Sequence, residues 1–292
     1  MIFDDSQDVH LQVEYIIITN GGSLQIGTEN KPFEHKAIIT MFGHCRSIEL
    51  PIYGSKVMAL RNGTINMHGK TVGVTWTNLG QTALANSNQI TLKEPVVWES
   101  GSEIVIATTG NLQSQGQNEV RRIVSKENNN QTLILDLPLS FTHLGVTRTI
   151  ADNVNVDIYA EVGLLTRNIL FRGHNDDSWN EFYSAPACPE GFDPGEFAVM
   201  TCFMGRYGPE LGSDQFGATI MISSGPRGPN ENEPVIAKFS NVEFFHVGQA
   251  FRLGRYPIHF HMNGDMPSSY VKECAIHQSF NRATNIHASN YM

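Results

Sequence analysis

Short stretches in which apolar and polar residues alternate run through the whole chain, separated by Gly, Asn and Pro. Alternation with a period of two places the apolar side chains on one face of an extended strand, whereas the spacing of an amphipathic helix is almost absent. Strands this short and numerous predict an all-β fold. The clearest runs are residues 15–18, 23–27, 37–43, 56–60, 63–69, 103–107, 131–135, 168–171, 218–222 and 242–245.

Two kinds of connection separate these strands. Asn20-Gly21 and Asn62-Gly63 are typical of tight hairpins between antiparallel strands. In the C-terminal half, short strands turn at Gly or Asn in a loose repeat, which is typical of the coils of a β-solenoid. We therefore expect a β-solenoid over most of the chain.

The histidines suggest a length for the repeat. His246 and His277 are 31 residues apart, and His259 and His287 are 28 residues apart, each pair in a similar local context. Successive coils of just under 30 residues would produce both spacings. We therefore expect His246 to stack on His277, and His259 to stack on His287.

The run His259-Phe260-His261 is the strongest candidate for chemistry. Side chains alternate along a strand, so both imidazoles point to one face and Phe260 points to the other. A zinc-type site needs a third ligand, and His287 on the next coil, about 4.8 Å away, would supply it. Two interpretations stay open: a metal or carbohydrate-contacting site formed by these three histidines, and a ladder of hydrogen-bonded imidazoles that contributes packing.

Composition narrows the classes of function. Of the 292 residues, 17% are charged, and the formal net charge is −9 at pH 7. A nucleic-acid-binding protein needs clustered Lys and Arg to neutralise phosphates, and the sequence has no such cluster. The first 30 residues show no basic segment followed by an apolar run, so no signal peptide is predicted. The run at residues 15–18 is far too short to cross a membrane.

A segment rich in Pro, Gly and acidic residues lies between Cys188 and Cys202. A disulfide that closes this segment is our preferred interpretation, with two free thiols as the alternative. A loop tied in this way is typical of recognition sites, and Trp179 and Tyr183 beside it are candidate contact residues. Asn62 and Asn130 begin N-glycosylation sequons. These features favour an extracellular protein.

Five segments of the chain, in the same order, resemble proteins that carry a G8 domain followed by a β-helix. They are residues 22–33, 102–107, 160–169, 254–261 and 269–282. The resemblance implies a partial G8 domain over residues 1–70 and a right-handed parallel β-helix of the pectin-lyase type over residues 71–292. It also implies that the chain is a fragment, cut within a coil at its C-terminus, of the extracellular part of a membrane protein in the fibrocystin branch. Any membrane tether would then lie in parts of the protein outside this chain.

The family resemblance also bears on function. Two relatives, the cell-migration-inducing hyaluronan-binding protein and transmembrane protein 2, are associated with hyaluronan depolymerisation. Both carry a long insertion after the strand that corresponds to residues 74–76, whereas only 13 residues, 77–89, separate that strand from the next one here. The resemblance therefore implies a non-catalytic extracellular recognition or structural module without a cofactor, whose partner is an extracellular protein or a glycan.

The alternative function is an enzyme that processes hyaluronan or another glycan at a site centred on His259 and His261, with a divalent metal as cofactor. Arg255 and Arg282 would then bind the anionic sugar, although each would equally pair with a nearby glutamate. Hydrolysis normally needs two carboxylates that face each other across the scissile bond. The adjacent pair Asp176-Asp177 lies in a predicted turn, where Asp side chains commonly serve local hydrogen bonding.

Overall fold

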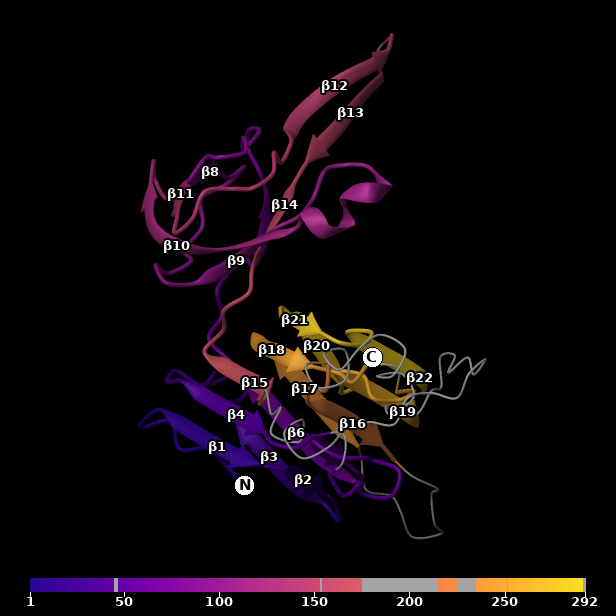
Figure 1. Ribbon diagram of the computed structural model, residues 1–292. Helices are drawn as coiled ribbons and strands as arrows, with labels where there is room; N and C mark the ends of the chain where they lie inside the picture. Colours follow the sequence, from indigo (N-terminus) through magenta and orange to yellow (C-terminus); the bar gives the residue numbers. More distant parts are fainter. Residues whose placement is uncertain (45–46, 153, 175–214, 225–234, 251, 291–292) are drawn as a thin grey trace, which may run out of the picture. The chain divides into compact units, whose positions relative to one another are not determined.

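The computed structural model describes residues 1–44, 47–152, 154–174, 215–224, 235–250 and 252–290. The chain divides into two compact units. Met1–Lys70 and Arg167–Met292 form the first unit, and Thr71–Thr166 form the second. The second unit is therefore an insertion in the sequence of the first (Figure 1).

Three parallel sheets build the first unit, and the chain visits them in the same order in each coil. The first sheet contains β1 (Val9–Val13), β4 (Ala37–Met41), β15 (Ile169–Gly173), β18 (Val242–Val247) and β21 (Ala275–Ser279). The second contains β2 (Tyr15–Ile18), β5 (Val57–Leu60), β16 (Thr219–Ser223), β19 (Ile258–Asp265) and β22 (Thr284–Asn290). The third contains β3 (Gly22–Ile26), β6 (Gly63–His68), β17 (Ile236–Ser240) and β20 (Tyr270–Lys272). The unit is thus a parallel β-helix, as the repeat in the sequence predicts.

The bends between the sheets repeat from coil to coil. Asn241 and Glu273 occupy equivalent positions after β17 and β20, and both have a left-handed backbone, with φ of 53° and 54°. Such a conformation is costly for most residues, and Asn tolerates it better than others. The Asn241 amide also donates a hydrogen bond to the Glu273 carboxylate over 3.1 Å. Matching bends in successive coils keep neighbouring strands in register.

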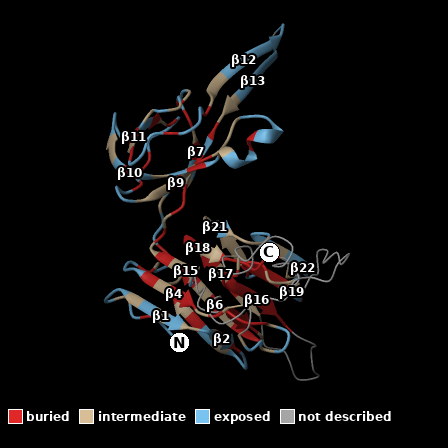
Figure 2. Ribbon diagram, in the orientation of Figure 1, coloured by how far each residue is buried: buried red, intermediate tan, exposed pale blue. Residues whose placement is uncertain are grey.

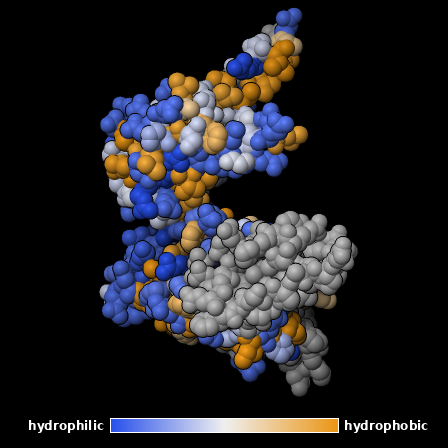
Figure 3. Space-filling view, viewed as in Figure 1, coloured by the Kyte–Doolittle hydropathy of each residue, from blue (hydrophilic) through white to orange (hydrophobic). Residues whose placement is uncertain are grey.

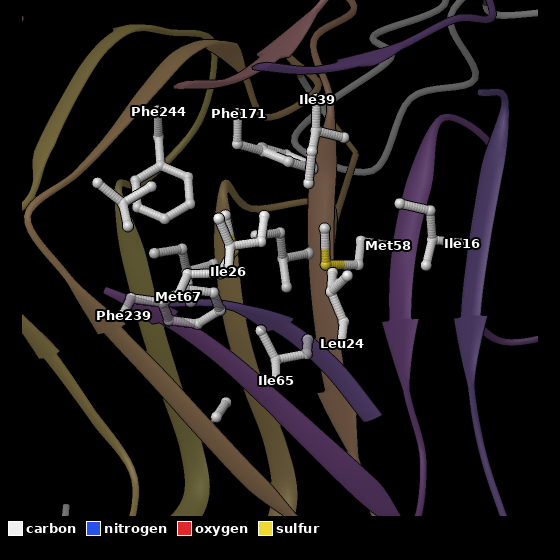
Figure 4. Packing of buried hydrophobic residues seen from close by; sticks show 14 of the residues in the cluster. Ile16, Leu24, Ile26, Ile39, Met58, Ile65, Met67, Phe171, Phe239 and Phe244 are labelled. Atoms are coloured by element: carbon white, nitrogen blue, oxygen red, sulfur yellow. The ribbon is translucent and has the colours of Figure 1, made fainter. Parts of the chain in front are cut away.

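The core of the β-helix consists of the apolar residues that alternate inward along each strand. Phe171, Phe239, Phe244 and Phe260 have no exposed surface. Phe244 packs on Phe171 at 6.0 Å between ring centroids, and edge-on against Phe239 at 5.6 Å. Figure 4 shows this aromatic stack beside Ile26, Ile39 and Met67, and Figure 2 shows that buried residues follow the strands of the coil. Each coil therefore completes the core of its neighbours.

Antiparallel strands build the second unit. Six of them form one sheet in the order β7 (Trp76–Asn78), β14 (Glu161–Leu164), β9 (Glu103–Ile106), β10 (Glu119–Glu127), β11 (Thr132–Leu135) and β8 (Gln89–Thr91). A 3-10 helix, η1 (Leu112–Gln117), connects β9 to β10. The fully buried Trp98 lies in the core and donates its indole N–H to the Val74 carbonyl over 2.6 Å. This unit has its own hydrophobic core.

A two-stranded ribbon extends the second unit. It consists of β12 (Gly145–Ala151) and β13 (Val154–Tyr159), which pair antiparallel. Ile150, Val154 and Val156 are exposed large hydrophobic residues of the ribbon, and Figure 3 shows hydrophobic side chains gathered along it. Among the described residues, the structure contains no helix long and apolar enough to span a bilayer.

This organisation differs from the predicted division at residue 70. The first 70 residues provide two complete coils of the β-helix, because β4, β5 and β6 pair in parallel with β15, β16 and β17. The helix therefore begins at the N-terminal strands, and residues 71–166 form the inserted antiparallel unit. Alternation of apolar residues predicts strands but does not distinguish parallel from antiparallel partners, so the sequence pattern could not reveal the insertion.

Candidate metal centre

Strand β19 places two histidines on the outer face of the β-helix. Ile258 and Phe260 have no exposed surface and point into the core. His259 and His261 alternate with them and therefore point outward, as the HxH pattern predicts. Their imidazole centroids lie 4.9 Å apart. Packing of Phe260 in the core thus fixes the direction of both imidazoles.

The third histidine comes from the next coil. Strand β22 pairs His287 with His261, and their Nδ1 atoms lie 3.2 Å apart. His259, His261 and His287 each offer a nitrogen, and these atoms all lie within 4.8 Å of one another. The three residues expected from the sequence as metal ligands therefore converge on one point of the outer face.

The predicted stacking of individual histidines was wrong in register. His259 pairs with Asn285, while His277 lies beside Phe245 and not beside His246. The reason is that the coils are unequal in length. Asn241 and Glu273, which occupy equivalent positions in successive coils, are 32 residues apart, whereas His261 and His287 are 26 residues apart. A single repeat length could therefore not align both pairs.

His259 has the environment of a metal ligand. Its Nδ1–H donates to the Gly254 carbonyl over 3.0 Å, and Gly254 sits in a turn with a φ of +79°. The opposite nitrogen, Nε2, is buried and has no hydrogen-bond partner among the residues that the structure describes. Metal-binding histidines characteristically use one nitrogen to donate to a carbonyl or carboxylate, which leaves the other lone pair for the metal. Buried polar atoms are otherwise nearly always paired.

Charge favours the neutral imidazole at this position. Burial, with smaller contributions from the charges of His261, His287 and Arg255, lowers the pKa of His259 to about 4, although the Gly254 hydrogen bond acts in the opposite direction. Burial also lowers the pKa of His261, again with a contribution from His287. Metal binding requires an unprotonated imidazole. Both ligands are therefore available at neutral pH.

A cavity of about 540 Å³ opens over the three histidines. Arg255 lines it and donates from Nη1 to the Ile52 carbonyl over 3.0 Å. Gly54 makes room for this side chain, since a Cβ there would lie 2.5 Å from the Arg255 Nε. No Asp or Glu lines the cavity among the described residues. The cavity therefore combines three imidazoles with a guanidinium and carries no compensating carboxylate.

Other predicted site residues lie elsewhere. Arg282 stacks over the Tyr256 ring at 5.9 Å and donates to its hydroxyl over 3.3 Å, so it faces a different pocket. Glu243, one of the glutamates near these arginines in the sequence, accepts from His277 Nε2 over 3.0 Å and from the Arg167 backbone N–H over 2.9 Å. Trp179, Tyr183, Asp176, Asp177 and the proposed Cys188–Cys202 disulfide lie outside the described residues.

The two glycosylation sequons differ in accessibility. Asn62 is 8% exposed and lies in a bend with a left-handed backbone. Modification of Asn62 stays a prediction. Asn130 is exposed in the turn between β10 and β11 and can carry a glycan.

Two features of the site were not predicted from the sequence. The Gly254 carbonyl, which sets the tautomer of His259, belongs to a loop with no strand pattern. The apolar residues Ile52 and Leu253, which also line the cavity, come from two loops and are 201 residues apart in the chain. Only the order of the coils brings these loops together, because both connect the first sheet to the second. A sequence alignment of the coils in the correct register would have predicted that these two loops lie side by side.

The fold and the histidine cluster define a parallel β-helix protein with a candidate metal centre on its outer face. Family models for the G8 domain and the CEMIP beta-helix match residues 1–80 and 215–292, respectively. The chain belongs to the G8 domain-containing β-helix family.

Sequence comparison adds two kinds of relative. Over the whole length of this chain, the sequence is 51% identical to human fibrocystin-L. Over 98% of the length of this chain, it is 32% identical to mouse fibrocystin. It spans only 7% of the length of either protein. Among solved structures, the tailspike gp61 of Pseudomonas phage phi297 is similar, with 8% identity and a TM-score of 0.30 over 96% of this chain and 39% of that chain.

Proposed function

We propose that this chain is a divalent-metal-binding recognition module in the extracellular part of a fibrocystin-L-like membrane protein. The observation that carries the proposal is the convergence of three imidazoles around a buried, unpartnered His259 Nε2. In this proposal the metal and the cavity above it bind an extracellular protein or glycan without cleaving it. The close relation to fibrocystin-L supports the cell-surface location.

The ligand set suits zinc or a similar ion. Zinc sites with three histidines keep a fourth position open for water or a ligand, with metal–nitrogen distances of about 2.0–2.1 Å. Tetrahedral geometry at that distance separates the nitrogens by roughly 3.3 Å. The His261 and His287 Nδ1 atoms, which share a hydrogen bond, are 3.2 Å apart, and the ligand nitrogens of all three histidines lie within 4.8 Å of one another.

The composition of the cavity favours recognition over cleavage. Glycoside hydrolysis commonly uses two carboxylic acids about 5–10 Å apart, and the described cavity lining contains none. Asp5, from the other acidic pair, Asp4-Asp5, accepts hydrogen bonds from the backbone N–H groups of Glu34 and His35, so it has a structural role. The runner-up function, hyaluronan or glycan processing at His259 and His261, would have to rely on the metal alone.

Several finer features belong to the same proposal. We take the coil to be right-handed and of the pectin-lyase type, which agrees with the strong general preference of parallel crossover connections for that hand. A disulfide between Cys188 and Cys202 and a glycan on Asn130 are consistent with an extracellular location. Trp179 and Tyr183 remain proposed contact residues.

Metal titration of the chelator-treated, secreted ectodomain tests the proposal. We expect one zinc ion per chain and an increase in melting temperature, because an ion that binds only the folded state stabilises it. His259→Ala should weaken zinc binding at least about 100-fold. Substitution of a residue that only hydrogen-bonds to a metal ligand already costs about 10- to 100-fold, and His259 would bind the metal itself. His10→Ala, which removes an outward imidazole on β1 that bonds to Thr40, is the matched control and should leave the affinity unchanged. Equal zinc binding by wild type and His259→Ala would disprove the metal centre.

Labelled hyaluronan separates recognition from catalysis. The zinc-loaded ectodomain should leave the length distribution of the polymer unchanged over many hours. Depolymerisation that disappears in His259→Ala would establish the enzymatic alternative and contradict the non-catalytic part of the proposal.

A further inference from the structure

One arginine, Arg255, lines the cavity together with the three histidines. The Arg255 guanidinium has the Ile52 carbonyl as its side-chain hydrogen-bond partner, and among the described residues it makes no ion pair. The adjacent Arg252, by contrast, pairs with Glu49 at 2.7 Å. Arg255 is half-buried, and the Glu49 carboxylate, whose charge also acts on it, is already paired with Arg252. A bound anion would satisfy both Arg255 and a divalent metal on the three histidines.

Aliphatic side chains surround the same charge. Ile52 and Leu253 line the cavity and are 63% and 62% exposed, which is high for residues of this kind. The one aromatic residue of the described lining, Tyr256, is only 4% exposed and offers no face for a sugar ring. The hydroxyl groups of a sugar would find no hydrogen-bonding partner on Ile52 or Leu253, and leaving polar groups unpaired is costly.

We infer that the metal centre binds a carboxylate carried on an aliphatic group. One carboxylate oxygen takes the fourth coordination position of the metal in place of water, and the other accepts from the Arg255 guanidinium. The aliphatic part covers Ile52 and Leu253 at the mouth of the cavity. This inference rests on the proposed metal site, and it assigns the ligand to an aliphatic acid such as a peptide C-terminus or a fatty acid, in preference to a uronic sugar.

Cobalt provides the readout, because Co²⁺ bound by three histidines has visible absorption bands that change when the fourth ligand changes. The Co²⁺-loaded ectodomain is titrated with four sodium salts: octanoate, N-acetylleucinate, glucuronate and acetate. We expect octanoate or N-acetylleucinate to perturb the bands at a concentration at least 10-fold lower than glucuronate or acetate. Tighter binding of octanoate would indicate a lipid-like ligand, and tighter binding of N-acetylleucinate would indicate a peptide C-terminus.

Variants separate the two recognition elements. Arg255→Gln should weaken binding of the aliphatic probes at least 10-fold while the three histidines still bind Co²⁺, and Arg255→Lys should restore part of the probe binding. Leu253→Ser should abolish the preference for octanoate over acetate. Arg172→Gln, an outward arginine on β15 that bonds to Thr40, is the control and should bind the probes as the wild type does.

Each contrary result has a separate meaning. Glucuronate binding as tightly as the aliphatic probes, or bands that respond to none of the four anions, would overturn the inference and leave the metal centre standing. An ectodomain that binds no Co²⁺ would overturn the metal centre and the inference together.

Discussion

Phe244→Ala is expected to destabilise the β-helix by about 3–5 kcal/mol, which is the usual cost of removing a buried aromatic side chain. Phe244 has no exposed surface, stacks on Phe171 of the preceding coil and packs edge-on against Phe239 of β17. These two neighbours belong to different strands, β15 and β17, so the surrounding coils cannot close the cavity without losing register. Hydrogen exchange followed by mass spectrometry measures the loss, because amides of β15, β17 and β18 exchange through opening of this unit.

The inserted unit provides the control for this substitution. Amides of β9 and β10 should keep their wild-type protection, because the second unit has a separate core. Phe141→Ala, at a residue of the second unit that is 37% exposed, should cost less than about 1 kcal/mol. A loss below about 1 kcal/mol in Phe244→Ala would contradict the stacked core.

Glu119→Ala should destabilise the second unit by about 3–5 kcal/mol, the range for breaking a buried ion pair. The Glu119 carboxylate is 4% exposed and accepts from the backbone N–H groups of Ser140 and Phe141, each at 2.8 Å. It also pairs with the Arg121 guanidinium and with His143 Nε2, the latter at 3.0 Å. Removing it leaves a buried imidazole and two N–H groups without their acceptor. Urea unfolding monitored by the fluorescence of the buried Trp98 reports this unit.

Glu161→Ala is the matched control, since Glu161 is exposed on β14 of the same sheet. It should shift the unfolding free energy by no more than about 0.5 kcal/mol. Equal effects of the two substitutions would show that the Glu119 network does not stabilise the unit.

The Glu119 network also predicts a pH dependence. Burial alone would raise the pKa of Glu119, but hydrogen bonds from Ser140, His143 and Phe141 and the charge of Arg121 lower it overall. A carboxyl whose pKa is lower in the folded state stabilises the fold above its unfolded pKa, and this contribution is lost as the pH falls through the folded value. The gap in stability between wild type and Glu119→Ala should be constant near neutral pH and narrow below about pH 4.3. A gap that stays constant down to pH 2 would contradict this assignment.

The strands could be predicted from the sequence because their side chains alternate. Residues 63–69 and 218–222, for example, correspond to β6 and β16 within one residue. The register between the coils could not be predicted from the sequence, because bends such as those at Asn241 and His246 depend on backbone conformation and not on an apolar pattern. The inserted unit escaped prediction for a related reason, because its strands alternate in the same way as those of the β-helix.

The histidine site was predictable in its members but not in its geometry. Strand alternation places His259 and His261 on one face, and the solenoid repeat brings His287 near them. The neighbour of His287 turned out to be His261, because the coil is 26 residues long at this corner. Arg255 was predicted as a binding residue and lines the cavity, whereas the role of the Gly254 carbonyl was beyond prediction, because it depends on how one loop folds back over β19.

X-ray absorption at the zinc edge of the zinc-loaded ectodomain tests the metal centre most directly. We expect a first shell of four light atoms, with three imidazole nitrogens at about 2.0–2.1 Å, and the multiple-scattering pattern of imidazole rings. His261→Ala should reduce the imidazole count or abolish binding. A first shell of water and carboxylate oxygens without imidazole, or no retained zinc, would contradict the proposed site.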